Sequence, residues 1–285
     1  MAATEPSFLV RHEFLIRRLH SLTGIFFGGF VCFHLLVNAS VLGGPGAFQN
    51  MVHFIHMPGS ILPLVEWTLL FAPILFHMIV GLGMTMGMLP NNKNYPYEAN
   101  WRYTVQRITA LYLFFFILYH VFHMHGWFHF DAWLHLAERW GGHVFSPYNA
   151  SSTLSMALSN TLIALLYALG VLSAAFHFFN GIWTAGITWG IWTRPEAQAR
   201  ALKVCLGAFV VLSVVGLGAI WGARQIDPVE ALQVEDRMYE AKVEDGLIPA
   251  NEHKRYEGEL REEAETLSLP SVEVGESEPT STSGE

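Results

Sequence analysis

The stretch APILFHMIVG, residues 72–81, decides how this chain folds, because it places a single histidine inside an uncharged apolar run. No charged residue occurs from Trp67 to Asn92. A helix of about 20 apolar residues crosses a bilayer, so this run is long enough to do so. An imidazole left unpaired in that environment costs roughly 2 to 7 kcal/mol. His77 therefore needs a partner, and the nature of that partner is the first clue to function.

The whole composition supports a membrane protein. Of the 285 residues, 52% are hydrophobic and 14% are charged, and the mean hydropathy is +0.33. The apolar residues are gathered into five blocks bounded by polar or Pro/Gly segments. We therefore predict an all-α membrane protein with five transmembrane helices, in the blocks 19–42, 61–89, 103–124, 154–191 and 204–222.

Lysine and arginine predict the orientation of these helices. The N-terminal segment, the second loop and the fourth loop each carry three of these residues, whereas the first loop has none and the third has only Arg139. By the positive-inside rule the N-terminus is cytoplasmic and the C-terminus lies on the far side. The predicted organisation is a cytoplasmic N-terminal segment (1–18), a membrane domain (19–224) and a C-terminal tail (225–285).

The tail accounts for the acidity of the chain. It contains 17 Asp or Glu against five Lys or Arg, while the whole chain has a net charge of -8. Its first part, DPVEALQVEDRMYEAKVEDG, could form a helix, and its last residues, ESEPTSTSGE, are too polar to bury a core. We expect a solvated, mostly flexible extension with no function that the sequence identifies.

Four of the 14 histidines lie well inside apolar blocks, one on each of the first four predicted helices: His34, His77, His120 and His177. A separate hydrogen bond to a neighbouring helix would account for any one of them. One shared explanation covers all four, because a b-type haem between two helices takes one imidazole from each. Two bis-histidine haems are therefore predicted, and the absence of a CxxCH motif argues against covalently attached haem.

Depth predicts how the four histidines pair. At about 1.5 Å per residue, His120 and His34 lie about 8 and 12 Å from the far-side ends of their helices. By the same measure His77 and His177 lie about 24 and 33 Å from those ends. We call His34 and His120 the distal pair and His77 and His177 the inner, proximal pair. The second and fourth predicted helices also share a local likeness, FHMIVG and FHFFNG, in which Gly81 and Gly181 leave room beside the histidine for a porphyrin edge or another helix.

Haem propionates are anionic and need basic or hydrogen-bonding partners. Candidates stand at the cytoplasmic ends of the first and third helices. Plain positive-inside anchoring explains the arginines equally well, and His20 also fits the membrane interface. The residues predicted for this role are Arg17, Arg18, His20, Ser21 and Arg107.

Four motifs in order, RRLHSLTGIFFGGFVCFHLLVN, APILFHMIVG, WRYTVQRITALYLFFFILYH and GVLSAAFHFFNGIWTAGITWGI, resemble the cytochrome b membrane anchor of bacterial succinate dehydrogenase and fumarate reductase, in the class with five helices and two haems. The resemblance covers residues 14 to about 222 and excludes the tail. It implies that the distal and inner pairs are axial haem ligands, and that the protein resides in the bacterial cytoplasmic (inner) membrane. It also implies that an iron-sulfur subunit, served by a flavoprotein subunit that oxidises succinate, passes electrons through the haems to a quinone, typically menaquinone. The partners are then these two subunits, lipid and quinone, with no nucleic acid and no dicarboxylate site in this chain.

Glu66 is a candidate for the quinone end. It is the one acidic residue within the five blocks, near the far-side end of the second helix. Quinone reduction needs proton donors, and an intramembrane carboxyl is a candidate for that role. The alternative is a helix-start carboxylate favoured by the helix dipole.

Two other functions remain open from the residues alone. One is the cytochrome b subunit of a hydrogenase or formate dehydrogenase, against which the fifth block and the order of the motifs argue. The other is a transporter that uses the four histidines as a proton relay or metal site. That protein would be colourless, whereas the haem interpretation requires a pigment.

Overall fold

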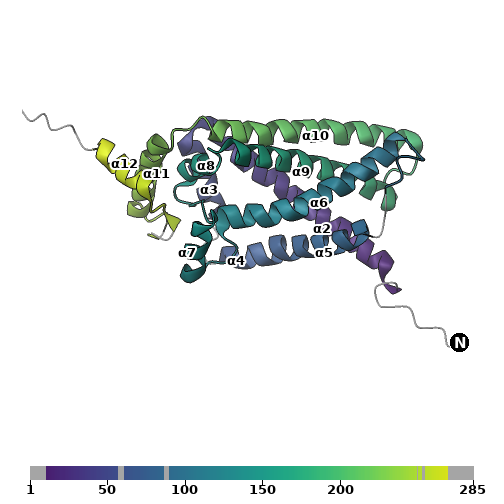
Figure 1. The fold of residues 1–285 in the computed structure, drawn as a ribbon, viewed down its shortest axis with the longest axis horizontal. Coiled ribbons are helices and arrows are strands. Elements are labelled where there is room, and N and C mark those ends of the chain that lie inside the picture. The colour runs from purple at the N-terminus through teal and green to yellow at the C-terminus, as the bar shows by residue number, and fades with distance from the viewer. Residues whose placement is uncertain (1–10, 57–60, 87–89, 249, 252–253, 269–285) are drawn as a thin grey trace, which may run out of the picture.

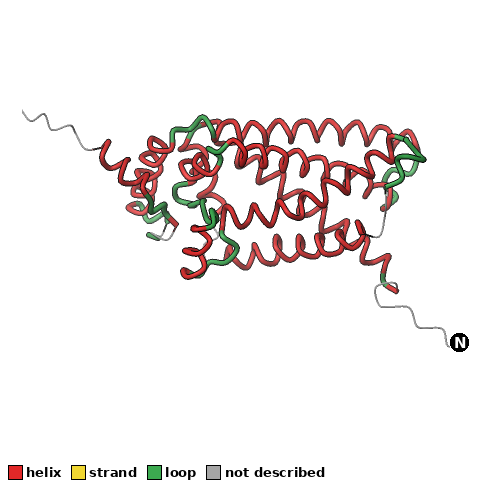
Figure 2. Tube along the Cα trace, in the orientation of Figure 1, coloured by secondary structure: helices red, strands yellow, loops and turns green. Residues whose placement is uncertain are grey.

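A computed structural model of the protein describes residues 11–56, 61–86, 90–248, 250–251 and 254–268. Residues 1–10 of the predicted N-terminal segment and 269–285 of the tail lie outside the described residues. In the described part Figure 2 shows helices and loops only. The five stretches long and apolar enough to cross a membrane are α2 with η1 (Glu13–Gly43), α4 to α5 (Leu62–Met86), α6 (Glu98–His125), α9 (Thr161–Thr188) and α10 (Pro195–Ala223). The prediction of an all-helical protein with five such spans is confirmed.

The five long helices lie side by side, and the shorter helices gather at one end of the bundle (Figure 1). We call this the capped end. The opposite, N-terminal end holds the start of α2, residues 90–97 that lead into α6, and the connection from α9 to α10. The short helices of the capped end are α3 (Pro45–His56), α7 (Asp131–Arg139), α8 (Ala150–Ala157), α11 (Pro228–Glu244) and α12 (Glu259–Ser268).

Helix α9 is central to the bundle, because it packs against α2, α6 and α10. Small residues make these approaches possible. A Cβ atom built on Gly28 of α2 would lie 1.9 Å from the ring of Phe178, and one on Gly170 of α9 would lie 2.4 Å from the ring of Phe116. Glycine at helix contacts lets backbones approach where no large side chain fits. The glycines therefore place the histidine-bearing helices close together.

The fourth predicted block needs a correction. The sequence predicted one helix from Leu154 to Ile191, but the chain breaks between α8 and α9. Asn160 precedes α9, and its side-chain oxygen accepts hydrogen bonds from the backbone nitrogens of Leu162 (2.8 Å) and Ile163 (3.3 Å). An asparagine that caps a helix in this way starts a new helix rather than continuing the old one.

The tail also differs from the expectation of a solvated, mostly flexible extension. Its first part forms α11, as the sequence allowed, but α11 packs against α3 and α8 instead of extending into solvent. Leu232 and Glu235 of α11 are fully buried. Helices α11 and α12 of the tail are thus part of the folded capped end.

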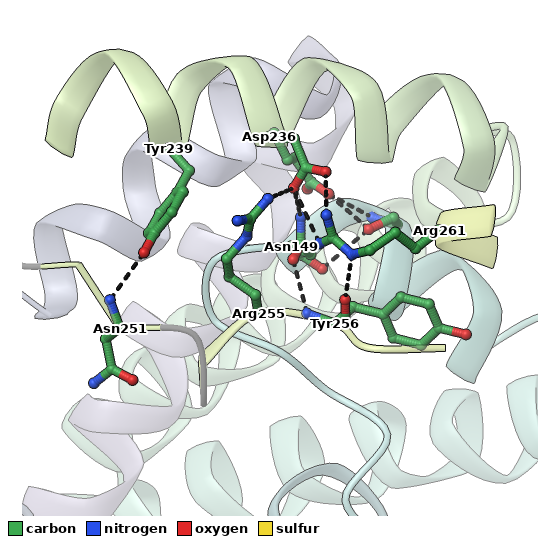
Figure 3. Close-up of polar contacts among 9 residues, drawn as sticks. Asn149, Asp236, Tyr239, Asn251, Arg255, Tyr256 and Arg261 are labelled. Carbon is green, nitrogen blue, oxygen red and sulfur yellow. Dashed lines mark hydrogen bonds and ion pairs between the residues drawn. The ribbon is translucent and has the colours of Figure 1, made fainter. Parts of the chain in front are cut away.

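Polar contacts hold this segment in place, and Figure 3 shows them around Asp236. The Asp236 carboxylate accepts a hydrogen bond from Asn149 Nδ2 (2.9 Å) and forms ion pairs with Arg255 (3.0 Å) and Arg261 (2.8 Å). The backbone nitrogen of Tyr256 donates to Asn149 Oδ1 (2.8 Å). A hydrophobicity profile misses this docking, because many of the contacts that hold the segment are polar.

Glu235 makes the most deeply buried of these contacts. Its carboxyl group accepts hydrogen bonds from the Ser152 hydroxyl (2.6 Å), from the backbone nitrogen of Ser152 (3.4 Å) and from that of Ser151, all in the first turn of α8. Burial raises the pKa of Glu235 to about 7, while the hydrogen bonds from Ser152 and Ser151 act in the opposite direction. Because the docked pKa lies above the ordinary value of 4.5, the carboxyl binds its proton more tightly in the docked state.

Docking of α11 is therefore expected to be strongest below pH 4.5 and to weaken as the pH rises through about 7. A pKa difference of this size corresponds to about 3 kcal/mol. Hydrogen-exchange protection factors of residues 228–244 in the detergent-solubilised protein measure it. Glu235→Gln should flatten the pH dependence, and Glu240→Gln, an exposed residue of the same helix, should leave it unchanged. Equal protection from pH 4.5 to 8 in the unmodified protein would refute the expectation.

Candidate functional site

The structure brings together the two histidines of each pair that depth predicted. The ring centres of His77 and His177 are 6.2 Å apart, with their planes at 85°. Those of His34 and His120 are 5.9 Å apart, at 76°. The inner pair joins α5 to α9, and the distal pair joins α2 to α6. The four residues thus form two separate pairs across helix interfaces.

Both rings of the inner pair are oriented through Nδ1. The Nδ1 of His77 lies 2.9 Å from the backbone oxygen of His20, and the Nδ1 of His177 lies 3.3 Å from that of Gln106. A carbonyl oxygen only accepts, so each Nδ1 carries the hydrogen and donates it. Each Nε2 then keeps its lone pair, which is the tautomer that a metal ligand requires.

The distal pair has different partners. The Nε2 of His34 lies 3.3 Å from Asn38 Nδ2 on the same helix, so binding a metal through this nitrogen requires Asn38 to turn away. The Nδ1 of His120 lies 3.4 Å from the hydroxyl of Tyr167, which also contacts the Nδ1 of His123 at 2.8 Å. A tyrosine of α9 thus positions the ring of His120 on α6.

The two pairs fit haem better than a bare metal ion. Two imidazoles that share one metal through bonds of about 2 Å have ring centres roughly 6 Å apart, as both pairs do. A porphyrin supplies the remaining ligands itself, so two histidines are enough. Among the described residues, no group of three or more His, Cys, Asp or Glu side chains is arranged to hold a metal ion.

The candidates for the propionates lie at the N-terminal end. The ring of His20 stacks on that of His77, with centres 4.0 Å apart, and its Nδ1 is buried without a hydrogen-bond partner among the described residues. Such an atom suits an anionic group that approaches from that side. Ser21 accepts a hydrogen bond from Trp189 (3.1 Å), and the guanidinium of Arg18 lies 4.6 Å from the centre of the Trp189 ring.

The remaining arginines differ in the groups that their guanidinium groups contact. Arg17 forms an exposed ion pair with Glu13 at 2.7 Å, and the guanidinium of Arg107 lies 3.3 Å from the centre of the Tyr103 ring. Arg102 did not stand out in the sequence, yet its Nη1 is buried without a hydrogen-bond partner in the described part of the chain. Its place near the start of α6, five residues before Arg107, was the available signal.

The glycines predicted to pack beside haem occupy different surroundings. A Cβ on Gly81 would lie 3.0 Å from the ring of His20, and one on Gly181 would be in ordinary contact with Gln106 at 3.7 Å. Neither adjoins the ring of its own histidine. Gly24 does so instead for the inner pair, because a Cβ there would lie 2.5 Å from Cε1 of His77. The GxxxG spacing of Gly24 and Gly28 was the signal that could have identified it.

An apolar cavity of about 180 Å³ lies between α6 and α9. Its walls are aromatic, and one of them, Phe116, stacks 5.9 Å from the ring of His120. Its volume is below the roughly 300 to 1,000 Å³ of most ligand pockets. The lining residues are Tyr112, Phe115, Phe116, Tyr119 and Leu166.

Glu66 lies at the capped end, in an unusual backbone. It begins a π-helical segment, η3 (Glu66–Phe71), between α4 and α5. Such segments are rare and are often found at functional sites. Its side chain is half-buried, and the ammonium group of Lys254, from the tail, acts on it electrostatically. The tail thus approaches the one carboxyl group that the sequence singled out.

These features define a class: an all-helical, five-span membrane protein whose buried histidines lie in pairs between helices. The family model described as succinate dehydrogenase/fumarate reductase transmembrane subunit matches residues 91–216. The succinate dehydrogenase cytochrome b558 subunit of Bacillus subtilis (strain 168) is 34% identical over 213 residues, which cover 73% of this chain and 96% of that protein. The chain therefore belongs to the family of succinate dehydrogenase/fumarate reductase transmembrane subunits.

Membership confirms the resemblance seen in the sequence motifs. The chain is a membrane cytochrome b subunit of this family and a multi-pass protein of the bacterial inner membrane. The hydrogenase and formate dehydrogenase alternative is set aside. Helices α11 and α12 lie beyond the residues that the family model matches.

Proposed function

We propose that this chain is a di-haem electron carrier that transfers electrons from an iron-sulfur subunit to a membrane quinone, and that this quinone is menaquinone. Histidines 77 and 177 would hold the inner haem, and histidines 34 and 120 the distal one. The observation that carries the proposal is the pairing of four buried imidazoles at ring separations of 5.9 and 6.2 Å. When bound, the haems supply one-electron redox chemistry.

The residues of the chain provide position and surroundings for this transfer. Backbone carbonyls of His20 and Gln106 orient the inner imidazoles, and the apolar helices keep water away from them. His20 and Arg102 present buried, unpartnered polar atoms at the N-terminal end, where they would bind the propionates, with Arg17, Arg18, Ser21 and Arg107 around them. A haem in this setting would be shielded from solvent inside the helix bundle. Its propionates would be held at the N-terminal end.

The quinone would react at the capped end, beside the distal pair. Glu66 is the proposed proton donor, because it is a half-buried carboxyl group at that end and faces a positive charge from Lys254. A carboxyl group exchanges protons with water and with a bound quinone oxygen when it lies between the two.

The partner subunits would bind at the N-terminal end. The basic residues of the N-terminal segment and of the loops before α6 and α10 lie there, and the positive-inside rule makes this end cytoplasmic. The iron-sulfur subunit would then face the inner haem, with the flavoprotein subunit beyond it. The capped end, with α11 and α12, would lie on the far side.

A haem count of the purified protein tests the proposal. The dithionite-reduced minus oxidised absorption spectrum should show b-type haem, and a pyridine haemochrome assay should give two haems per chain. A colourless protein would refute the proposal and favour transport or packing roles for the histidines. One haem per chain would refute the assignment of one pair.

A further inference from the structure

The inner and distal histidine pairs differ in the residues that position their imidazole rings, and the main difference is Gln106. This residue lies on α6, on the face that meets α9 next to His177. Its backbone oxygen accepts a hydrogen bond from the ring of His177 (3.3 Å), and its side-chain nitrogen donates to the backbone oxygen of His177 (3.0 Å). The two residues therefore hold each other reciprocally across the helix interface.

Two neighbours complete this contact. Asn180, which is buried, donates a hydrogen bond from Nδ2 to the side-chain oxygen of Gln106 (2.8 Å). The hydroxyl of Thr109 lies 3.4 Å from the Nδ1 of His177, and the backbone oxygens of Val105 (2.8 Å) and Gln106 (3.1 Å) are both within reach of its hydrogen. Both polar groups of the Gln106 amide are thus satisfied within the helix pair, which leaves its side chain with one conformation.

A hydrogen bond from Nδ1 to an oxygen makes an imidazole more basic, and a more basic ligand stabilises ferric over ferrous iron. The strength of that bond depends on how closely the donor and acceptor are held. The carbonyl that accepts from His177 belongs to the residue whose side chain ties α6 to α9. Gln106 therefore controls the distance on which the basicity of His177 depends.

We propose that Gln106, supported by Asn180, is a positioning residue that lowers the reduction potential of the inner haem through His177. The distal pair has no counterpart of this reciprocal contact among the described residues, since the partner of His120 is the hydroxyl of Tyr167. The two potentials are then set by different side chains. This inference rests on the proposed di-haem function.

Gln106→Met tests the inference, because methionine has a similar length and no hydrogen-bonding amide. We expect two haems per chain and a higher midpoint potential for the inner haem alone. A roughly tenfold shift of the ferric-to-ferrous equilibrium is expected, which is about 59 mV for a one-electron couple. Redox titration of the assembled complex, followed by optical spectra and by the low-spin ferric resonance signals, measures both haems separately.

Tyr167→Phe is the matched control for the distal pair. It removes the hydroxyl beside His120 and should move the distal potential while the inner potential stays at its original value. If Gln106→Met keeps both haems and leaves the inner potential unchanged, or moves both potentials equally, the inference is wrong.

If Gln106→Met loses haem, Asn180→Ala provides a second test of the inference. It frees the Gln106 amide but leaves the ring contact of His177 in place, so the inner potential should rise by a smaller amount. In the double variant the effects should not add, because both residues act through one contact. An unchanged inner potential in Asn180→Ala would overturn the inference. A colourless unmodified protein would instead refute the di-haem function itself.

Discussion

Replacing His77 with alanine is expected to remove the inner haem and to halve the haem content of the protein. His177→Ala should remove the same haem, because both histidines would bind the same iron. The single imidazole that remains would not retain the haem. The structure supports this coupling, since the centres of the two rings lie 6.2 Å apart between α5 and α9. The pyridine haemochrome assay gives the haem content, and the remaining spectrum identifies the distal haem.

A histidine outside the pairs provides the control. His135 is exposed on α7 and should be replaceable by alanine without loss of haem. A combined His77→Ala and His177→Ala variant should lose no more haem than either single variant. Loss of different haems in the two single variants would show that the pairing is wrong, and full haem in both would refute the ligand assignment.

Glu66→Gln is expected to lower quinone-linked turnover by about 100-fold or more, which is the usual contribution of a positioned proton donor. The glutamine keeps the size of the side chain but cannot release a proton. Both haems should remain, because Glu66 lies at the capped end and, among the described residues, no charge interaction joins it to the paired histidines. Succinate-driven quinone reduction by the assembled complex measures the effect.

Two comparisons separate a proton-transfer defect from damage to the complex. Succinate oxidation with a dye that accepts electrons directly from the partner subunits should be unchanged in Glu66→Gln. Glu138→Gln, a half-exposed carboxyl group on α7 at the same end of the bundle, should keep normal quinone reduction. Normal quinone reduction in Glu66→Gln would eliminate it as the proton donor.

Much of the fold could be predicted from the sequence because each membrane-spanning segment has to form a helix independently of the others. Each run of about 20 apolar residues has to be a helix in hydrocarbon, whatever its neighbours are. The break before α9 was missed because Asn160 caps a helix inside a continuous apolar run, and hydropathy alone does not register a cap. The short helices α3, α7 and α12 were not predicted because they lie outside the long apolar runs, whereas α11 falls in a stretch that the sequence allowed to be helical.

The candidate site shows the same division. The cost of an unpaired imidazole in hydrocarbon singled out His77 and the other deep histidines, and helix length predicted their pairing. The partners that orient them were not predictable, because Gln106 and Tyr167 lie 71 and 47 residues from the histidines they contact. Such contacts depend on which helix faces which neighbour.

What the sequence by itself determined is the set of membrane helices, the family and the depth of four histidines, because each follows from residues close together along the chain. The tertiary structure alone decided the docking of the tail. Glu235 meets Ser152 across 83 residues, in a segment too polar for any hydrophobic pattern to predict its burial. Hydrogen bonds and ion pairs need specific geometry between distant residues, and that geometry exists only after the helices have packed.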